Sequence, residues 1–329
     1  MRAPTFWWRG KPTLTAILLW PVGWAYGEVT ARRMSRKGVA SKSQKVICIG
    51  NFTAGGAGKT PVAIAVAKAL QHNSRSVCFL SRGYGGNALT PMLVDPLKHS
   101  AALVGDEPLL LGRIAPTIIA KNRADGLELC AATVADIIIM DDGLQNSSLQ
   151  KNITIAVVDA QTGTGNGLCV PAGPLRAPLD IQLKYVDIVV FLGDNEQSAL
   201  KSKLEKLFIP YFLAQLEAPS HTLSSLRGKA LLAYCGIGRP DKFFNTVEKI
   251  GGHVAKKRSF PDHHNFTEND AKALLEDAQK NHLTLITTEK DFARLPKDES
   301  YAGILAARSR VLPVEAVFNQ PQEFISLLL

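Results

Sequence analysis

One segment of the sequence has residue types that suit the binding of a nucleotide's phosphates. Residues 50–60 read GNFTAGGAGKT, between a short apolar run and a stretch of helix-forming residues. Glycines in such a loop let backbone N–H groups surround phosphate oxygens, and the following helix adds its positive dipole end. We predict that Lys59 reaches the β- and γ-phosphates of ATP and that the Thr60 hydroxyl binds Mg²⁺. The predicted ATP-binding residues are Thr53, Ala54, Gly55, Gly56, Ala57, Gly58, Lys59 and Thr60.

Two adjacent carboxylates form the second chemical feature. Asp141 and Asp142 directly follow the apolar residues 137–140, which read IIIM. An apolar strand that ends in a carboxylate is typical of a Walker B strand, which delivers an aspartate to the metal at the carboxyl edge of a sheet. Taken alone, Asp-Asp-Gly is a common turn. Downstream of a phosphate loop, the pair predicts a Mg²⁺ site.

These side chains need strands and helices to position them. After residue 45, short β-branched runs alternate with helical segments, which is typical of an α/β protein with a mostly parallel sheet. Strands are predicted at residues 46–49, 77–80, 137–140, 153–158 and 188–192, and in a second group at 230–235, 253–258, 283–287 and 311–317. Helices are predicted at 61–71, 241–250 and 267–281, the last opening with a capping box of Thr267 and Asp270.

The fold class that follows is α/β, with a sheet of the P-loop NTPase type and helices on both of its faces. A second, smaller α/β lobe and an N-terminal helix at a membrane interface complete the prediction. We expect three segments: a membrane-interface segment with a basic linker at 1–45, a P-loop core at 46–220 and a C-terminal α/β lobe at 221–329. The boundary between the two lobes falls in the polar stretch 217–227.

Positive charge is concentrated at the N-terminus. The net charge is +9, and residues 1–45 hold nine basic residues and one acidic residue, which leaves 29 basic and 28 acidic groups in the rest. A near-neutral body argues against a nucleic-acid surface and favours a local interaction with an anionic partner. All four tryptophans lie in this end, around the apolar residues 13–26. This stretch is too short to span a bilayer and contains Pro21, so we predict a helix lying on anionic lipid.

Two other interpretations of the N-terminal segment compete with this one. A cleaved signal peptide would export the phosphate loop away from ATP, which disfavours it. A helix packed on the protein's own core is the stronger alternative. The five cysteines form no C-x-x-C pair and lie mostly in apolar runs, so we expect them to be reduced and buried.

Several further motifs occur in a specific order along the chain. They are SRGYGG at 81–86, GDEP at 105–108, GNG at 165–167, PAGPLR at 171–176, GIGRPDKFF at 236–244, FPDHH at 260–264 and TEKD at 288–291. Each motif alone is compatible with a turn, a cap or a solvated loop. In this order and together with the phosphate loop, they resemble the tetraacyldisaccharide 4′-kinase family of lipid A biosynthesis.

The resemblance implies transfer of the γ-phosphoryl group of ATP, with Mg²⁺, to the 4′-hydroxyl of a tetraacylated glucosamine disaccharide 1-phosphate. It implies that Asp106 is the base and that His263 is its partner, although the sequence leaves open whether His263 or His264 pairs with Asp106. By the same resemblance, Asp141 and Asp142 serve Mg²⁺. Tyr84, Gln145 and Arg176 then line the substrate site. The implied location is the cytoplasmic face of the inner membrane, peripheral or monotopic, and no protein partner is implied.

Three positions depart from the expected patterns. Thr53 stands where the general phosphate-loop pattern has glycine, so a glycine-rich turn without a ligand is the alternative interpretation. Asn146 and Ala177 stand where many members of the family have histidine and glutamate. Catalytic roles for side chains at these last two positions are therefore not expected here.

Other classes of protein share some of these features. A membrane-associated regulatory P-loop ATPase is the alternative enzyme, but such proteins carry a signature lysine where this chain has Ala54. A GTPase is disfavoured because the chain has no N-K-x-D motif. A non-enzymatic lipid-binding module is the third class, which lipid-dependent ATP turnover would exclude.

Overall fold

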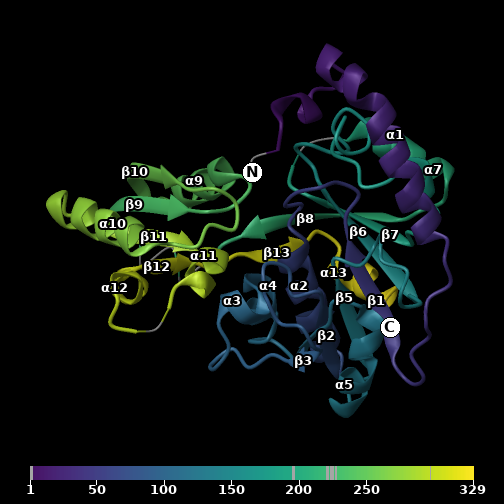
Figure 1. Ribbon diagram of the computed structural model, residues 1–329, viewed down its shortest axis with the longest axis horizontal. Coiled ribbons are helices and arrows are strands. Elements are labelled where there is room, and N and C mark those ends of the chain that lie inside the picture. Colours follow the sequence, from purple (N-terminus) through teal and green to yellow (C-terminus); the bar gives the residue numbers. More distant parts are fainter. Residues whose placement is uncertain (1–2, 195–196, 220–221, 223–225, 227, 297) are drawn as a thin grey trace.

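The computed structural model describes residues 3–329 except 195–196, 220–221, 223–225, 227 and 297. It has two sheets, and each is covered by helices on both faces (Figure 1). The large sheet has nine strands in the order β13-β8-β7-β6-β1-β5-β2-β4-β3. Its strands are β1 (Lys45–Gly50), β2 (Val77–Ser81), β3 (Met92–Leu93), β4 (Thr117–Ile119), β5 (Ile137–Asp141), β6 (Ile153–Asp159), β7 (Ile188–Leu192), β8 (Tyr211–Glu217) and β13 (Glu315–Phe318).

The central strands are parallel and fully buried, as their continuous apolar sequences predict. Alternate side chains of β1 point to opposite faces, so Ile47 and Ile49 join one core cluster while Val46 and Cys48 join another. The strand pair β1–β5 is in register with Ile49 opposite Asp141. The carboxyl ends of these two strands therefore bring the phosphate loop and the carboxylate pair to the same edge of the sheet.

Helix α2 (Lys59–His72) begins directly after the phosphate loop and buries an apolar stripe against the sheet. Helix α13 (Pro321–Ser326) covers the same face, while α5 (Leu127–Ala132), α6 (Leu179–Leu183) and α7 (Ser198–Lys206) belong to the clusters of the other. Near the carboxyl edge lie the short helices α3 (Ala101–Val104), α4 (Asp106–Leu111) and η2 (Arg123–Gly126).

The smaller lobe is built on a four-stranded parallel sheet in the order β10-β9-β11-β12. Its strands are β9 (Ala230–Cys235), β10 (His253–Ser259), β11 (Thr284–Thr288) and β12 (Arg310–Leu312). Its helices are α9 (Pro240–Lys249), α10 (Glu268–Lys280), α11 (Glu289–Arg294) and α12 (Tyr301–Arg308). The capping box predicted at Thr267 and Asp270 is confirmed at the start of α10.

One predicted strand was wrong. Residues 311–317 do not form a single strand, because they contribute to β12 in the small sheet and to β13 in the large sheet. Pro313 separates the two and cannot donate a hydrogen bond to a ladder. Strand β13 pairs antiparallel with β8, so residues 315–318 return to the large sheet. The strands β3, β4 and β8 were not predicted.

The division into three segments stays a prediction, since part of its boundary at 217–227 lies outside the described residues. The last residues of the chain pack on the large sheet. There Phe324 of α13 stacks on Phe318 and meets Phe212 edge-on.

The N-terminus forms a short helix η1 (Thr5–Trp8) and a long helix α1 (Leu14–Met34), which lies along one side of the large lobe (Figure 1). Helix α1 extends beyond the predicted apolar stretch 13–26, and it carries the basic residues Arg32 and Arg33 in its last turn. Within the described ranges, no helix is long and apolar enough to cross a membrane.

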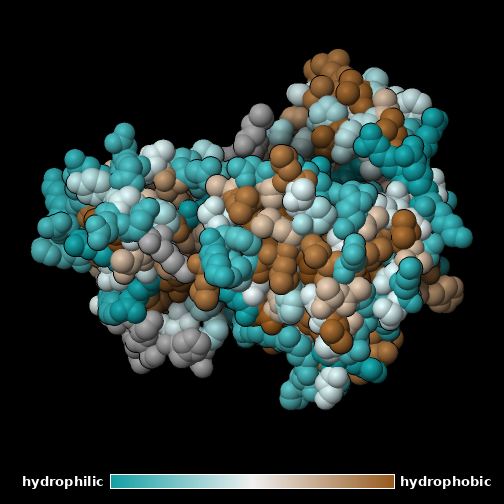
Figure 2. All heavy atoms as spheres, turned by 60° about the horizontal axis from the view of Figure 1, so that its bottom comes forward, coloured by the Kyte–Doolittle hydropathy of each residue, from teal (hydrophilic) through white to brown (hydrophobic). Residues whose placement is uncertain are grey.

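The two faces of α1 differ in character. The face turned to the protein consists mostly of small residues, among them Ala16, Gly23 and Gly27, and ends in Met34. Figure 2 shows hydrophobic residues gathered around the N-terminal end of α1. The large apolar side chains on the outer faces of α1 are exposed. They are Leu14, Ile17, Leu18, Trp20, Val22, Trp24, Tyr26 and Val29.

Candidate active site

The phosphate loop connects β1 to α2 and leaves its glycines open. Gly55 and Gly58 have φ angles of +109° and +83°, in the left-handed region that favours glycine. A Cβ atom on Gly58 would lie 2.2 Å from Cδ2 of Leu192, so a larger residue does not fit there. Around Gly55 and Gly56, no atom lies within 4 Å of an added Cβ. The backbone at these glycines is therefore accessible to a ligand.

Lys59 is held at the start of α2 by two polar partners. Its Nζ donates a hydrogen bond to Oδ1 of Asn51 at 3.3 Å and lies 3.5 Å from Oδ1 of Asp142. Asn51 is fully buried and donates from Nδ2 to the carbonyl of Thr53 at 2.7 Å. Asn51 was not predicted as a site residue, although it lies in the glycine-rich segment. It fixes both the loop and the lysine.

Asp141 and Asp142 have opposite environments. Both carboxylate oxygens of Asp141 are buried and have no hydrogen-bond partner within the described part of the chain. Burial raises the pKa of Asp141 to about 7, and the charges of Glu107 and Asp142 act in the same direction. Burial also opposes ionisation of Asp142, but Lys59 and Arg176 outweigh it and hold its pKa well below the usual range. Asp142 is therefore already paired, and Asp141 is not.

The unpaired oxygens of Asp141 are what a buried site for a divalent cation requires. A buried carboxylate without a partner is costly unless a cation compensates it. No group of three or more His, Cys, Asp or Glu side chains could hold a metal among the residues described. Mg²⁺ in nucleotide sites is usually bound by one or two carboxylates together with phosphates and water, so this arrangement fits Mg²⁺.

Arg176 and Gln145 lie directly against the phosphate loop. Arg176 donates from Nε to the carbonyl of Thr53 at 3.0 Å and from Nη1 to Asp142 at 2.8 Å. Gln145 donates from Nε2 to the carbonyl of Asn51 at 2.8 Å and accepts from Arg176 at 3.3 Å. Both predicted side chains are thus brought to the loop. Arg176 is partly exposed, so it remains accessible to an anionic ligand.

Asp106 and His263 come together across the two lobes. Asp106 is the first residue of α4 and is 3% exposed, and its Oδ2 lies 3.2 Å from Nδ1 of His263. The Tyr84 ring meets the His263 ring edge-on at 5.2 Å between centroids. His264 instead pairs with Asp270 of the capping box at 2.9 Å. The geometry therefore selects His263, rather than His264, as the partner of Asp106.

Sequence reasoning missed the cations that flank this pair. Arg294 of α11 donates from Nε to Oδ2 of Asp106 at 2.9 Å and also from Nη2 to the same oxygen. Lys290, one turn earlier, forms an ion pair with Glu107, which follows Asp106 in α4. Lys290 belongs to the TEKD motif, and Arg294 follows three residues after its aspartate, Asp291, with which it also pairs at 2.8 Å. The motif was a usable signal for Lys290, but nothing in the sequence placed α11 against α4.

The charges around Asp106 set its protonation. Burial alone would raise the pKa of the Asp106 carboxyl, but the hydrogen bond with His263 and the charges of Arg294 and Lys290 outweigh it and keep that pKa well below its usual range. The hydrogen bond to Asp106 raises the pKa of His263. Lys290 and Lys59 likewise overcome burial and lower the pKa of Glu107. The positive charges of Lys59 in the phosphate loop and of Lys290 in the smaller lobe thus both favour the ionised form of Glu107.

The loop at 162–178 links the N-terminal helices to the phosphate loop. Trp7 of η1 donates from Nε1 to the carbonyl of Pro171 at 2.9 Å. A Cβ atom on Gly23 of α1 would lie 2.6 Å from the carbonyl oxygen of Cys169. Further along this loop, the carbonyl oxygen of Pro174 accepts a hydrogen bond from the backbone N–H of Ala54 at 2.7 Å. Ala177, which follows Arg176, is fully buried.

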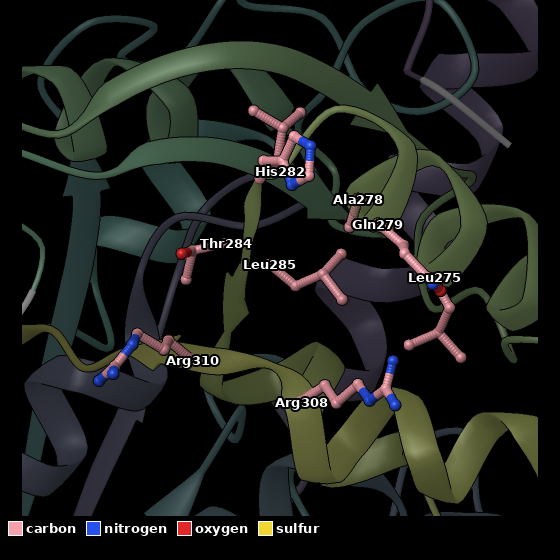
Figure 3. A pocket seen from close by; sticks show the side chains of 9 residues that line it. Leu275, Ala278, Gln279, His282, Thr284, Leu285, Arg308 and Arg310 are labelled. Carbon is pink, nitrogen blue, oxygen red and sulfur yellow. The ribbon is translucent and has the colours of Figure 1, made fainter.

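A groove of about 440 Å³ lies elsewhere, in the smaller lobe (Figure 3). It lies between α10, β11 and the end of α12, where Leu275 and Leu285 meet Arg308. None of the predicted site residues lines it. The site described above instead follows the carboxyl edge of the large sheet, where ligands bind in open α/β folds.

Comparison with known proteins gave consistent matches over nearly the whole chain. A family model described as tetraacyldisaccharide-1-P 4′-kinase matches residues 15–329. A tetraacyldisaccharide 4′-kinase of Methylobacterium sp. (strain 4-46) is 48% identical over 317 residues, which cover 96% of this chain and 95% of that protein. A tetraacyldisaccharide 4′-kinase of Rhizobium meliloti (strain 1021) is 45% identical over 320 residues, covering 97% and 92%.

One solved structure is similar over the whole fold. It is the "apo" form of LpxK from Aquifex aeolicus in complex with ATP, with a TM-score of 0.73 and 21% sequence identity. The match covers 96% of this chain and 98% of that chain. This likeness confirms the predicted fold class.

Proposed function

The chain belongs to the tetraacyldisaccharide-1-P 4′-kinase family, and from this premise we propose the reaction of its site. The protein is a kinase of lipid A biosynthesis. In the proposed reaction, it transfers the γ-phosphoryl group of ATP to the 4′-hydroxyl of a tetraacylated glucosamine disaccharide 1-phosphate.

The observation that carries this proposal is that Lys59 of the phosphate loop lies near the Asp106–His263 pair. The charges of Lys290 and Lys59 both act on Glu107, the residue next to Asp106. Asp106 in turn meets His263 at 3.2 Å. Phosphoryl transfer to an alcohol needs both parts, because the phosphoryl charge must be stabilised while the attacking hydroxyl loses its proton.

ATP binds with its phosphates on residues 53–60 in this proposal. The open backbone at Gly55 and Gly56 accepts phosphate oxygens, and Lys59 is held ready by Asn51 and Asp142. Asp141, Asp142 and Thr60 would hold Mg²⁺, and the unpartnered oxygens of Asp141 support this choice. When bound, Mg²⁺ neutralises charge on the phosphate oxygens.

The acceptor sugar lies beside the Asp106–His263 pair, which takes the proton from its 4′-hydroxyl. The Tyr84 ring packs against His263 and is 63% exposed, so it offers a face for the sugar. Arg176 and Gln145 stand on the other side, at the phosphate loop, and Arg176 is suited to an anionic group of the substrates.

We further propose that α1 lies on the cytoplasmic face of the inner membrane, where the lipid-linked acceptor and ATP are both present. The exposed apolar side chains of α1 include Trp20 at 52% and Trp24 at 59% exposure. Indole rings favour the headgroup level, and the basic residues at both ends of the segment favour anionic lipid. This arrangement is peripheral or monotopic.

The test is an assay of ADP formation with purified disaccharide 1-phosphate in detergent micelles. The proposal predicts that ADP forms only when the lipid acceptor is present. Equal turnover without the acceptor would favour a membrane-associated regulatory ATPase instead.

A further inference from the structure

The loop at 162–178 contacts the N-terminal helix η1 on one side and the phosphate loop on the other. We propose that η1, through this loop, holds the phosphate loop in the conformation that binds ATP, with Trp7 and Asn166 as positioning residues. This inference rests on the proposed kinase function and adds a determinant of ATP affinity to it. The N-terminal segment then supports the nucleotide site in addition to its proposed contact with lipid.

Helix η1 is fixed to the loop through both the main chain and the side chain of Trp7. The carbonyl oxygen of Trp7 accepts the backbone N–H of Asn166 at 2.8 Å. The Trp7 indole donates from Nε1 to the carbonyl oxygen of Pro171 at 2.9 Å. Trp20 and Trp24 on α1 are exposed, whereas Trp7 is buried in the protein. Contact with lipid therefore does not account for Trp7.

Asn166 holds the loop in its folded shape. It is buried, donates from Nδ2 to the carbonyl oxygen of Ala172 at 2.9 Å and accepts the backbone N–H of Leu168 at Oδ1, 3.1 Å away. A Cβ atom on Gly173 would lie 2.0 Å from the same Oδ1, so the chain packs tightly around this side chain. Asn166 thus links the main chain that contacts η1 to the turn that precedes Pro174.

At Gly165, η1 and Pro174 approach the same point of the main chain. A Cβ atom there would lie 2.3 Å from the carbonyl oxygen of Trp7 and 2.6 Å from Cγ of Pro174. The φ angle of Gly165 is +61°, in the region that favours glycine. Helix η1 and Pro174 are therefore packed on the main chain of Gly165, with no room for a side chain between them.

The opposite side of the loop supports the start of the phosphate loop. The carbonyl oxygen of Pro174 accepts the backbone N–H of Ala54 at 2.7 Å, and the backbone N–H of Arg176 donates to the carbonyl oxygen of Phe52 at 2.9 Å. The residues between these two contacts form an antiparallel bridge. The start of the phosphate loop is thus held by the loop at 162–178, which is itself held by η1.

This support matters for ATP because a ligand binds more weakly when it must order the segment that receives it. The apparent dissociation constant rises as the fraction of protein in the binding-competent conformation falls. With η1 in place, the start of the phosphate loop is ordered before ATP arrives. Displacement of η1 removes part of the support of Pro174 and Arg176, so the affinity for ATP falls. No contact in this series involves Asp106 or His263, so kcat should change less than the affinity.

Equilibrium binding of MgATP to the full-length protein in detergent, without the lipid acceptor, tests the inference. Trp7→Ala and Asn166→Ala should each raise the Kd for ATP roughly three- to tenfold, the effect of losing about one hydrogen bond. The matched control is Asn152→Ala, which removes an acceptor of the backbone N–H of Val46 at the opposite end of β1. It should keep the wild-type Kd. With the acceptor present, the KM for ATP should rise more than kcat falls in Trp7→Ala.

Two glycines of the loop separate the contact with η1 from backbone strain. Gly165 and Gly167 have φ angles of +61° and +76°, so an alanine is strained at either position. Only at Gly165 does the added methyl group meet Trp7 and Pro174, because no atom lies within 4 Å of a Cβ on Gly167. Gly165→Ala should therefore weaken ATP binding, whereas Gly167→Ala should not.

Wild-type Kd values in Trp7→Ala and Asn166→Ala, in proteins that thermal melts show to be folded, would overturn the inference. An equal rise of Kd in Gly165→Ala and Gly167→Ala would do the same. If Trp7→Ala does not fold, Trp7→Phe replaces it, since this variant keeps a ring and loses only the Nε1 donor. Lipid-dependent turnover of the wild-type enzyme tests the proposed function, whereas these affinities are measured without the acceptor and test the inference alone.

Discussion

Arg294 of the smaller lobe donates from Nε to Oδ2 of Asp106 at 2.9 Å, although 188 residues separate the two in sequence. Both side chains are 3% exposed. The ion pair Lys290–Glu107 lies beside it and joins the same two helices, α11 and α4. Asp106 therefore comes from the large lobe, while His263, Arg294 and Lys290 come from the smaller lobe. The pair proposed to accept the proton thus depends on the contact between the two lobes.

The phosphate loop gives the simplest prediction. Lys59→Ala should lower phosphoryl transfer by roughly 10³-fold or more while the protein stays folded, because it removes a cation aimed at the transferring group. The matched control is Lys68→Ala on the exposed side of the same helix, where the lysine pairs with Glu315. Steady-state kinetics and thermal melts on both variants check this, and near wild-type turnover in Lys59→Ala would refute the loop assignment.

The unpartnered carboxylate of Asp141 predicts that removing its charge stabilises the metal-free protein. Burial raises its pKa to about 7, so the folded state favours the neutral carboxyl, and ionisation of Asp141 lowers the stability of the fold. Without metal, Asp141→Asn should therefore be more stable than the wild type above pH 7, by roughly 1–3 kcal/mol. Chelation of Mg²⁺ should abolish wild-type turnover. A melting temperature that falls in Asp141→Asn would contradict this account.

A second contact between the lobes predicts a response to acid. Asp159 at the end of β6 accepts a hydrogen bond from Arg239 at 2.6 Å and pairs with Lys242, both from the start of α9. Although burial opposes it, Lys242 and Arg239 lower the pKa of Asp159. The ionised Asp159 therefore stabilises the folded protein at pH values above the pKa of an aspartate in the unfolded chain, about 3.9. This stabilisation is lost as the pH falls through the lower pKa that Asp159 has in the folded protein.

Asp159→Asn should consequently melt at a lower temperature than the wild type at pH 7, because two partly solvated cations lose their partner. The free energy of unfolding should fall by roughly 1–3 kcal/mol. The difference should shrink as the pH is lowered below 4. Melting curves at several pH values measure this. A difference that does not depend on pH would mean that the ion pairs contribute nothing.

The exposed apolar face of α1 is predicted to bind the membrane. Replacing Leu18, Trp20 and Trp24 by serine should reduce binding to vesicles that contain anionic lipid, because these side chains are 73%, 52% and 59% exposed. The melting temperature should stay unchanged, since the buried residues of α1, such as Ala16, Gly23 and Met34, are not replaced. A matched triple substitution of Leu89, Leu93 and Leu97, also exposed, serves as the control. Unchanged flotation with vesicles would place the membrane contact elsewhere.

The sequence predicted the parts of this molecule that depend on local chemistry. The glycine pattern placed the phosphate loop between β1 and α2, and the apolar runs placed the central parallel strands, because such strands are buried on both faces. The site at the carboxyl edge followed from the position of Asp141 after its strand. The pairing of Asp106 with a histidine of the DHH segment followed only from the family resemblance.

Contacts between distant segments were not predictable in the same way. Strand β13 has the same kind of short apolar sequence as β12, and only tertiary packing sends it to the other sheet. His263 and His264 are neighbours in sequence, so the sequence does not show which of them meets Asp106. In the structure His264 is hydrogen-bonded to Asp270 instead. Nothing in the sequence of the six-residue helix α11 singles out Arg294, because its contact with Asp106 depends on the packing of α11 on α4.

The most direct test of the account is the location of the transferred phosphate. The wild-type enzyme, given γ-labelled ATP and the tetraacylated disaccharide 1-phosphate, should place the label on the 4′-oxygen, one label for each ADP formed, as read by phosphorus NMR of the isolated lipid. An acceptor that lacks the 4′-hydroxyl should reduce ADP formation to background. Equal ADP formation with this acceptor, or label on any other oxygen, would contradict the assignment of the site as a 4′-kinase.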